Sequence, residues 1–296
     1  MSTARITEIF YSIQGEGVFI GLPQIFIRFA GCNLTCKYCD VSRELPEREF
    51  TVRKLVQLIA ALNKSVSRGS PPQSPFAHPR AREPAFCKGG LRGIRKAGLV
   101  HSVALTGGEP LLQADFLGNL LPCLKRNGFK VYLETNGTLP AELKKVGRWC
   151  DFIAVDIKLP SATGGNPLWE VHKPFLKEAL AVCPVPNTFV KVVVTGETIQ
   201  KDIAYAALLV QSISSNVVFI IQPAVTKTNT LNPSCRGRIH PPRGLDKHVP
   251  VWVKQGSSPY GYWCDSQKLL GFLKSARKFL PSVRLIPPIH QILNLP

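Results

Sequence analysis

Short apolar runs alternate along this 296-residue chain with longer stretches in which apolar residues recur every three or four positions. The short runs predict β-strands, because they are rich in branched and aromatic residues and are bounded by glycine or polar segments. Seven such strands are expected, at residues 24–30, 101–106, 130–135, 152–158, 189–194, 217–222 and 283–286. Helix-like stretches lie between most of them, which indicates an α/β protein.

The longer stretches have the spacing of amphipathic helices. Residues 51–63 form one, with Thr51 in the N-cap position. Residues 115–128 form another that ends in a glycine at the C′ position, although Pro122 is unfavourable inside a helix. A third helix is expected over 267–280, with these apolar residues along one face: Leu269, Leu270, Phe272, Leu273, Ala276 and Phe279.

Alternating strands and helices predict parallel strands with the helices outside. Six or seven strands are too few for a closed eight-stranded barrel, so we expect a partial (β/α) barrel or an open curved sheet, in a single domain over residues 1–296. In both architectures the chemistry gathers at the C-terminal ends of the strands. Four polar motifs fall at such ends, which predicts one shared site: "GCNLTCKYCD", "TGGEP", "ETNG" and "DIKLP".

Two windows, 64–98 and 226–261, interrupt this pattern and are rich in Pro, Gly and Ser. They hold eight and six Lys or Arg residues with one acidic residue each, and so carry +12 of the net charge of +18. We interpret them as basic, flexible, solvated insertions, which weakens the case for nucleic acid as the main partner. Binding of RNA or of an acidic partner, and an error in the translated sequence, are the alternatives.

The cellular setting is inferred from the cysteines and from the apolar runs. The chain has nine cysteines, no apolar run of membrane-spanning length, and an N-terminus, "MSTARITEIF", without the basic-then-apolar profile of a secretion signal. We therefore expect a cytoplasmic protein with reduced thiols and no membrane partner.

Three of the cysteines, Cys32, Cys36 and Cys39, are spaced C-x3-C-x2-C. Thiolates are soft ligands that suit iron–sulfur clusters, zinc and copper. Three ligands with no fourth close by favour a metal centre with an open coordination position, such as a 4Fe–4S cluster whose free iron chelates an amino and a carboxylate group. The alternative is a structural zinc site completed by a distant ligand, for which the candidates are Cys87, Cys123 and His101.

The "GGEP" motif follows a predicted strand about 70 residues after the cysteines. Gly107 and Gly108 allow a backbone to approach a ligand closely, and Glu109 can accept a hydrogen bond from an ammonium group. Two glycines after a strand are often only a tight turn. Together with the cysteine motif they become a specific signal.

The two motifs together resemble the radical S-adenosylmethionine (SAM) superfamily. Further motifs make the chain, outside its two basic windows, resemble the 7-carboxy-7-deazaguanine synthase family, with "IQGEG" as the most specific part. These occur in the family's order: "SIQGEG", "FIRFAGC", "CKYCD", "ALTGGEPLLQ", "ETNG", "DIKLP" and "VRLIPPIH". The resemblance implies a partial barrel of the radical SAM type, a homodimer, and a reducing partner such as flavodoxin or ferredoxin.

The resemblance also implies a reaction. The family converts 6-carboxy-5,6,7,8-tetrahydropterin into 7-carboxy-7-deazaguanine with loss of ammonia, on the route to queuosine and related 7-deazapurines. A reduced 4Fe–4S cluster cleaves SAM, and the resulting 5′-deoxyadenosyl radical takes a hydrogen atom from the pterin. The cofactors perform the hard chemistry, so no side chain is assigned as an acid or base.

The resemblance also assigns roles to the residues of this chain that match the family's motifs. The cluster ligands are Cys32, Cys36 and Cys39. The positions implied to contact SAM are Tyr38, Cys39, Asp40, Gly108, Asp156, Ile157 and Lys158. The positions implied to contact the substrate are Ile13, Gln14, Gly15, Arg28 and Thr106.

The chemistry of two of these substrate residues agrees with their implied roles. The amide of Gln14 can read the guanine-like edge of a pterin, and the planar guanidinium of Arg28 can bind its carboxylate with two hydrogen bonds. The alternatives are a turn cap for Gln14 and a surface ion pair for Arg28.

One position departs from the family. The family usually has Thr or Ser after Cys-Asp, where it helps to bind Mg²⁺, whereas Val41 has no side-chain oxygen. Backbone carbonyls at Val41, water and the nearby Asp40 are the remaining ligands, so dependence on Mg²⁺ is an open question.

The chain end is a further candidate. The last residues are apolar, and we expect them to pack so that the terminal carboxylate of Pro296 reaches the substrate. His290 is a weaker candidate for the site. The other histidines, which fall in presumed loops or insertions, receive no role: His78, His172, His240 and His248.

Two other functions stay open at this point. Another radical SAM enzyme, such as a glycyl-radical activase, would share the cysteines and "GGEP" but should lack "SIQGEG". A basic nucleic-acid-binding protein with a structural metal site would bind RNA with a strong dependence on salt and would not cleave SAM.

Overall fold

The structure is a computed structural model that describes residues 2–41, 45–67, 100–227, 260–262 and 266–292. Its centre is a nine-stranded sheet in the order β11-β8-β7-β6-β5-β4-β2-β1-β3. Seven strands pair in parallel: β2 (Pro23–Phe29), β4 (Ser102–Gly107), β5 (Val131–Thr135), β6 (Phe152–Asp156), β7 (Thr188–Val194), β8 (Phe219–Pro223) and β11 (Val283–Leu285). β1 (Thr3–Ile13) and β3 (Arg48–Thr51) extend the sheet in antiparallel pairing.

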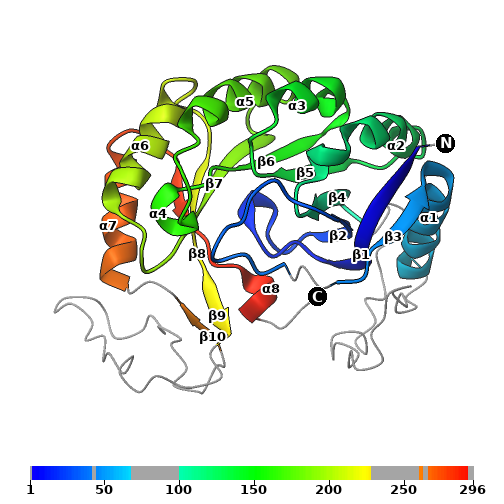
Figure 1. Ribbon diagram of the computed structural model, residues 1–296, viewed down its shortest axis with the longest axis horizontal. Helices are drawn as coiled ribbons and strands as arrows, with labels where there is room; N and C mark the ends of the chain where they lie inside the picture. Colours follow the sequence, from blue (N-terminus) through cyan, green and yellow to red (C-terminus); the bar gives the residue numbers. More distant parts are fainter. Residues whose placement is uncertain (1, 42–44, 68–99, 228–259, 263–265, 293–296) are drawn as a thin grey trace.

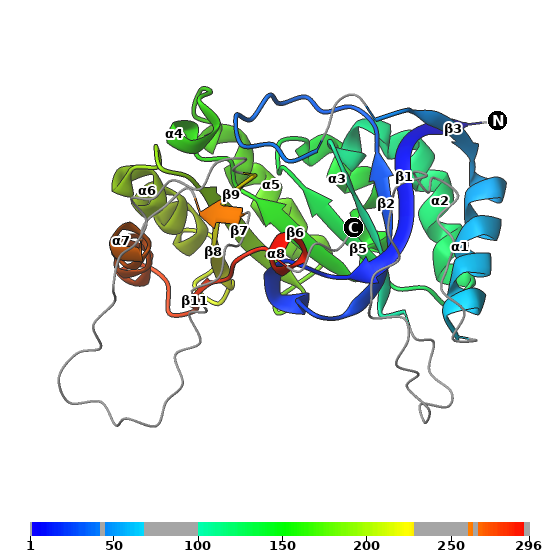
Figure 2. The same cartoon turned by 90° about the horizontal axis from the view of Figure 1, so that it is seen from below.

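The sheet curves, and its two edge strands, β11 and β3, do not pair with each other. Helices cover its outer face (Figures 1 and 2): α1 (Val52–Ser67), α2 (Ala114–Arg126), α3 (Pro140–Val146), α5 (Trp169–Val182), α6 (Gln200–Gln211) and α7 (Ser266–Arg277). The expected partial barrel is therefore confirmed. No helix in the described part of the chain is both long and apolar enough to cross a bilayer.

Short elements complete the fold. They are η1 (Gly17–Phe19), η3 (Pro110–Gln113), η4 (Gly147–Trp149), α4 (Pro160–Thr163), α8 (Ile289–Ile292) and a hairpin of β9 (Val225–Lys227) with β10 (Tyr260–Tyr262). Helix α8 lies on the inner side of the curved sheet (Figure 1), where the N–H of Ile289 donates to the carbonyl of Gly15 at 2.9 Å.

Side chains alternate across the sheet, as strand geometry requires. On β2, Ile25 and Ile27 belong to the large core that the helices cover, whereas Phe26 faces inward. The inward cluster is rich in aromatic residues, and Phe26 stacks on Phe10 with ring centroids 5.1 Å apart. This cluster fills part of the inner face.

The predicted helices and strands are present, and the residues predicted to begin α1 and to end α2 have these positions in the structure. The hydroxyl of Thr51 accepts from the N–H of Lys54 at 3.3 Å at the start of α1, and Gly128 follows α2 with a φ of 79°. Pro122 lies inside α2 without interrupting it.

The described ends of the two basic windows lie in regular elements. Helix α1 continues to Ser67, and the β9–β10 hairpin includes both ends of the second window, because amphipathic and pairing residues extend past the boundaries drawn from composition. The remainder, 68–99 and 228–259, lies outside the described residues.

Candidate active site

A pocket with a cavity volume of about 450 Å³ opens at the C-terminal ends of the parallel strands. Its walls come from β2, β4, β5, β6, β7, β8, the cysteine loop after β2, the loop after β1 and the segment around α8. It collects almost every residue named from the sequence: Ile13, Gln14, Gly15, Arg28, Cys32, Cys36, Tyr38, Cys39, Asp40, Val41, Thr106, Gly108, Asp156, Lys158 and His290. The four polar motifs therefore form one site.

The side chains of two named residues lie away from this pocket: Ile157, and Glu109, which is described below. The side chain of Ile157 is fully buried in the core, and its N–H donates to the carbonyl of Lys191 at 2.9 Å. The side chain points to the face opposite that of Asp156, as alternation along a strand requires, and a contact of Ile157 with SAM stays a prediction. Pro296 lies outside the described residues.

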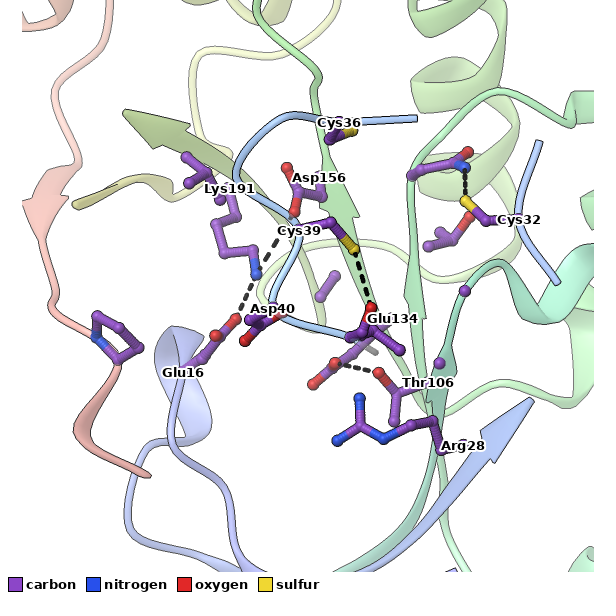
Figure 3. A pocket seen from close by; sticks show the side chains of 18 of the residues that line it. Glu16, Arg28, Cys32, Cys36, Cys39, Asp40, Thr106, Glu134, Asp156 and Lys191 are labelled. Atoms are coloured by element: carbon purple, nitrogen blue, oxygen red, sulfur yellow. Dashed lines mark hydrogen bonds and ion pairs between the residues drawn. The ribbon is translucent and has the colours of Figure 1, made fainter. Parts of the chain in front are cut away.

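The three cysteines lie in the loop that follows β2, along one side of the pocket (Figure 3). All three are free thiols; Cys32 and Cys39 are exposed and Cys36 is partly buried. Burial raises the pKa of the Cys36 thiol, against the opposing effect of Lys158. A thiol with a raised pKa becomes a thiolate when a metal centre supplies positive charge.

The two glycines of "TGGEP" allow two loops to meet. A Cβ at Gly107 would lie 2.3 Å from the carbonyl oxygen of Phe29, and one at Gly108 would lie 1.9 Å from that of Gly31. Gly107 also has a φ of 127°. The glycines thus hold the "TGGEP" loop directly against the start of the cysteine loop.

Glu109 has a different role from the one expected. It is fully buried and absent from the pocket wall, and its carboxylate accepts from the N–H of Leu111, the hydroxyl of Thr135 and the N–H of Asn136 at 2.7–3.0 Å. Burial raises the pKa of Glu109 to about 7, although these donors oppose the shift. The carboxylate therefore ties "TGGEP" to "ETNG" rather than binding a ligand ammonium.

A chain of alternating charges crosses the pocket. Lys191 lies between Glu16 and Asp156 (Figure 3), with 3.5 Å to Asp156 Oδ2, and Lys158 Nζ lies 2.9 Å from the same oxygen. Burial alone would raise the pKa of Glu16, but the attraction of Lys191 lowers it to about 2. Glu16 is thus an anion and Lys191 a cation throughout the physiological range.

A second acidic group lies deeper. Glu134 accepts from the amide of Gln14 and from the hydroxyl of Thr106, both at 2.8 Å, and Figure 3 shows it beside Thr106 and Arg28. Burial, followed by repulsion from Glu16, raises the pKa of Glu134. Glu134 therefore takes up a proton more readily than Glu16 does.

Gln14 lines the pocket, and its side-chain amide is bonded to protein groups. Its nitrogen donates to Gln24 and Glu134, and its oxygen accepts from the N–H of Glu16 at 3.0 Å. Gln14 thus orients the carboxylate of Glu134 and holds the backbone at Glu16.

Arg28 reaches the pocket from β2, opposite the cysteines. Its Nε donates to Glu8 Oε2 at 2.6 Å, and its guanidinium lies 5.8 Å from the ring centre of Phe10. Arg28 therefore forms an ion pair and also lines the pocket, and its binding of a substrate carboxylate stays a prediction.

The pocket residues that the sequence analysis does not name include Glu16, Glu134 and Lys191. Each carried a signal. Glu16 belongs to "SIQGEG" and Glu134 to "ETNG", and Lys191 is the one charged residue in the apolar strand "TFVKVVV". A charge inside a buried strand is costly unless it is paired, so it indicates a site.

The comparisons with known proteins agree with this geometry. The model of the radical SAM superfamily matches residues 26–208. A 7-carboxy-7-deazaguanine synthase from Geobacter sulfurreducens is 36% identical over 291 residues, which cover 98% of this chain and 97% of that relative. The chain belongs to the 7-carboxy-7-deazaguanine synthase family. A synthase of the same name from Methanothermobacter thermautotrophicus is 28% identical over 99% of this chain and 98% of the relative. The crystal structure of QueE from Escherichia coli matches with a TM-score of 0.47 and 21% identity, over 75% of this chain and 84% of that one.

Membership of the radical SAM superfamily implies a 4Fe–4S cluster and SAM, and the pocket fits both. Three thiols lie on one side. Nearby, Asp156 Oδ1 and Gln222 Oε1 are buried acceptors without a hydrogen-bond partner among the described residues. Buried acceptors of this kind are ordinarily satisfied, so they suit the hydroxyl and amino donors of a bound ligand.

The zinc alternative finds no support in the described part of the chain. Cys123 lies on α2, where Arg126 donates to its sulfur, and His101 precedes β4 at the end opposite to Thr106. Cys87 is outside the described residues. Neither Cys123 nor His101 lines the pocket that holds the three cysteines.

Proposed function

We propose that this protein converts 6-carboxy-5,6,7,8-tetrahydropterin into 7-carboxy-7-deazaguanine with loss of ammonia, for queuosine or a related 7-deazapurine. The observation that carries the proposal is the single pocket, which has the cysteines on one side and Arg28 with two carboxyl groups on the other, in a chain related to such synthases over nearly its full length. A small, flat, carboxylated substrate matches this arrangement of charges.

The cluster would be held by Cys32, Cys36 and Cys39, and SAM would lie against Tyr38, Gly108 and the strand end at Asp156 and Lys158. Once bound, the cluster and SAM supply the radical chemistry that removes a hydrogen atom from the substrate. The unpartnered Asp156 Oδ1 supports this placement, since it can accept from a ribose hydroxyl. The ammonium of Lys158, 5.4 Å from the ring centre of Tyr38, holds the cysteine loop against the strand end.

The substrate would bind on the opposite side of the pocket. Arg28 would bind its carboxylate through the nitrogens that Glu8 leaves free, while Glu134 and Glu16 would accept from the amino and N–H donors of the pterin edge. Ile13, Gly15 and Thr106 would complete the contact, together with His290 and the terminal carboxylate of Pro296. Packing α8 across the mouth would exclude water from this side.

We also propose a magnesium site, at which the ion is bound weakly. Asp40 and the backbone of Val41 line the pocket, but no side-chain oxygen follows Asp40. We therefore expect any Mg²⁺ to be held mainly by water and substrate oxygens, and weakly.

The proposed partners are a small-molecule substrate and a protein reductant, for which flavodoxin or ferredoxin is expected. The enzyme itself is proposed to be a homodimer in the cytoplasm. We propose a single domain over residues 1–296; the two basic windows, 64–98 and 226–261, lie largely outside the described residues. Neither nucleic acid nor a large glycyl-radical enzyme is needed as a partner for this chemistry.

The direct test is anaerobic reconstitution with iron and sulfide, followed by incubation with SAM, a reductant and the tetrahydropterin. We expect 7-carboxy-7-deazaguanine and ammonia in equal amounts, and loss of both in Cys36→Ala. The Cys123→Ala variant, whose cysteine lies on α2, is the matched control and should keep its activity. SAM cleavage without conversion of the pterin would refute the substrate and retain the radical chemistry.

A further inference from the structure

His172 is a fully buried histidine that the chemistry proposed above does not use. From the sequence it was placed in a loop, but it lies in the first turn of α5. The error arose because a helix that begins after Pro167 and Leu168 has no polar N-cap to mark its start. Its ring points from the helix layer toward the ends of β5 and β6, where both ring nitrogens have partners.

These partners are backbone groups from two different motifs. Nδ1 lies 3.1 Å from the carbonyl oxygen of Gly137, in the "ETNG" turn after β5. Nε2 lies 3.2 Å from the backbone nitrogen of Lys158, at the end of "DIK" after β6. A single side chain therefore joins the ends of two neighbouring strands.

The partners also fix the position of the imidazole proton. A carbonyl oxygen can only accept a hydrogen bond and a backbone N–H can only donate one, so Nδ1 must carry the proton and Nε2 must be bare. Burial keeps the ring in this neutral form, because it lowers the pKa of His172 to about 4. Both hydrogen bonds of the His172 ring are then present over the whole working range of pH.

Each of the two strand ends that His172 joins also contacts the cysteine loop. Beside Gly137, the amide nitrogen of Asn136 donates to Asn33 Oδ1 at 2.8 Å and lies 3.9 Å from the sulfur of Cys32. On the other strand, the ammonium of Lys158 lies over the ring of Tyr38. The distance between the two strand ends thus sets how both flanks of the cysteine loop are held.

Gly137 has the close approach that this contact requires. It has a φ of +69°, and a Cβ there would lie 2.9 Å from Val155 and 3.1 Å from Nδ1 of His172. The turn is therefore packed against the imidazole as well as bonded to it, which leaves the "ETNG" backbone little freedom to shift.

We propose that His172 is a positioning residue that holds the two strand ends in the geometry needed to bind SAM beside the cluster. The inference rests on the proposed placement of SAM at these ends, but not on the identity of the substrate. His172 itself touches neither SAM nor the pterin in this account. It acts through the backbone of Gly137 and Lys158.

The test uses the full-length reconstituted protein and three variants. His172→Leu removes both hydrogen bonds and keeps an apolar side chain. His172→Gln keeps a donor and an acceptor on a single amide, so it can restore part of the hydrogen bonding to Gly137 and Lys158. Leu176→Val is the matched control, because Leu176 is fully buried one turn later on α5 and its substitution removes only a buried methylene.

We expect His172→Leu, which loses both hydrogen bonds, to weaken SAM binding about tenfold, as measured by calorimetric titration of the cluster-loaded protein. The iron content and the KM for the pterin should stay at wild-type values, and His172→Gln should recover most of the affinity. Leu176→Val should leave SAM binding unchanged. A general loss of stability would weaken the binding of both SAM and the pterin, so an effect on SAM alone excludes it.

A second readout is the tautomer of the ring in the wild-type protein. In the protein labelled with ¹⁵N-histidine, the two-bond ¹H–¹⁵N spectrum should show one ring with a protonated Nδ1 and a bare Nε2, and that signal should vanish in His172→Gln. Wild-type affinity for SAM in His172→Leu, an equal loss in Leu176→Val, or the opposite tautomer would overturn the inference. Failure of the wild type to convert the pterin, with these SAM effects intact, would instead refute the proposed substrate.

Discussion

Arg28 is oriented by the protein before any ligand is present. Its Nε is bonded to Glu8, its partner across the β1–β2 pairing, and its guanidinium lies over Phe10. The terminal nitrogens remain as a planar pair of donors, the arrangement that binds a carboxylate with two parallel hydrogen bonds. A lysine at this position would supply the charge without the geometry.

We therefore expect Arg28→Lys to raise the KM for the carboxylated pterin about tenfold or more, because one of two charge-assisted hydrogen bonds is lost. Cleavage of SAM in the absence of substrate should not change. Steady-state kinetics would measure both quantities. Arg126→Lys, on the outer helix α2, provides the same substitution away from the pocket. An unchanged KM in Arg28→Lys would remove Arg28 from the substrate site.

Val41 offers a gain-of-function test for the metal. Its substitution by Thr places a hydroxyl oxygen directly after Asp40, and Mg²⁺ prefers oxygen ligands. After chelator treatment, the Mg²⁺ concentration needed for half-maximal turnover should fall severalfold in Val41→Thr. Val41→Ile, which adds bulk without oxygen, should show no such fall. Equal Mg²⁺ requirements in all three proteins would place the metal elsewhere or exclude it from turnover.

His172 also predicts how stability depends on pH. Its pKa is about 4 in the folded protein against a usual value of 6.5, so between these pH values the unfolded chain binds a proton that the folded protein does not. The stability that the neutral ring contributes is present above pH 6.5 and is lost as pH falls through 4. The raised pKa of Glu109 acts in the opposite direction, so wild-type data alone would mix the two effects.

A difference measurement isolates the histidine. The gap in unfolding free energy between wild type and His172→Gln should shrink by about 3 kcal/mol from pH 7 to pH 4, at 1.36 kcal/mol per pKa unit. Urea unfolding of both cluster-free proteins across this range would measure it. A gap that is constant with pH would mean that His172 titrates normally.

At the scale of elements, α8 and the loop after β1 depend on each other. Gly15 accepts from the N–H of Ile289, and a Cβ at Gly15 would lie 2.2 Å from Nδ1 of His290. Any side chain at position 15 must displace the helix that covers this side of the pocket. The glycine is thus needed for the close approach of two segments far apart in the sequence.

We expect Gly15→Ala to raise the KM for the pterin severalfold and to increase cleavage of SAM without product, since the pocket would admit more water. Both are measured by comparing the yields of 5′-deoxyadenosine and product. Gly118→Ala is the matched control, because a Cβ at Gly118, on α2, would contact nothing within 4 Å. Coupled turnover at the wild-type level in Gly15→Ala would show that α8 is not part of the substrate site.

Helices and strands with a regular pattern of apolar and polar residues could be predicted from the sequence. The strand β1 was not predicted because its pattern is irregular. Its pairing with β2 shifts register between Ile6 and Glu8, and the resulting irregularity breaks the strict alternation of apolar and polar residues. The four-residue β3 is too short to carry a periodic signal. The parallel strands, by contrast, are continuous apolar runs, which is typical of strands buried on both faces.

The site was predictable to the extent that its residues lie in motifs. The cysteines, Arg28 and Asp156 were named correctly as neighbours, because parallel strand ends converge on one edge of the sheet. Hydrogen-bond partners were not predictable: Gln14 and Glu109 turned out to bond to protein groups. Which partner a buried polar group finds depends on packing between distant segments, and the local sequence does not encode it.

At the scale of the whole molecule, the curved sheet brings the cofactor side and the substrate side into one cavity of about 450 Å³. The cysteine loop, reaching over the strand ends (Figure 2), supplies one side, and β2 with the loop after β1 supplies the other. The central claim is that both reactants occupy this cavity together, so that a hydrogen atom passes directly between them.

Transfer of an isotope tests this claim most directly. The reconstituted protein would be given SAM and a tetrahydropterin deuterated at its ring carbon–hydrogen positions, and the 5′-deoxyadenosine formed would be examined by mass spectrometry. The account predicts that one deuterium appears in 5′-deoxyadenosine in step with 7-carboxy-7-deazaguanine. Product formed while the 5′-deoxyadenosine stays unlabelled would contradict it, because the two reactants would then not meet in one site.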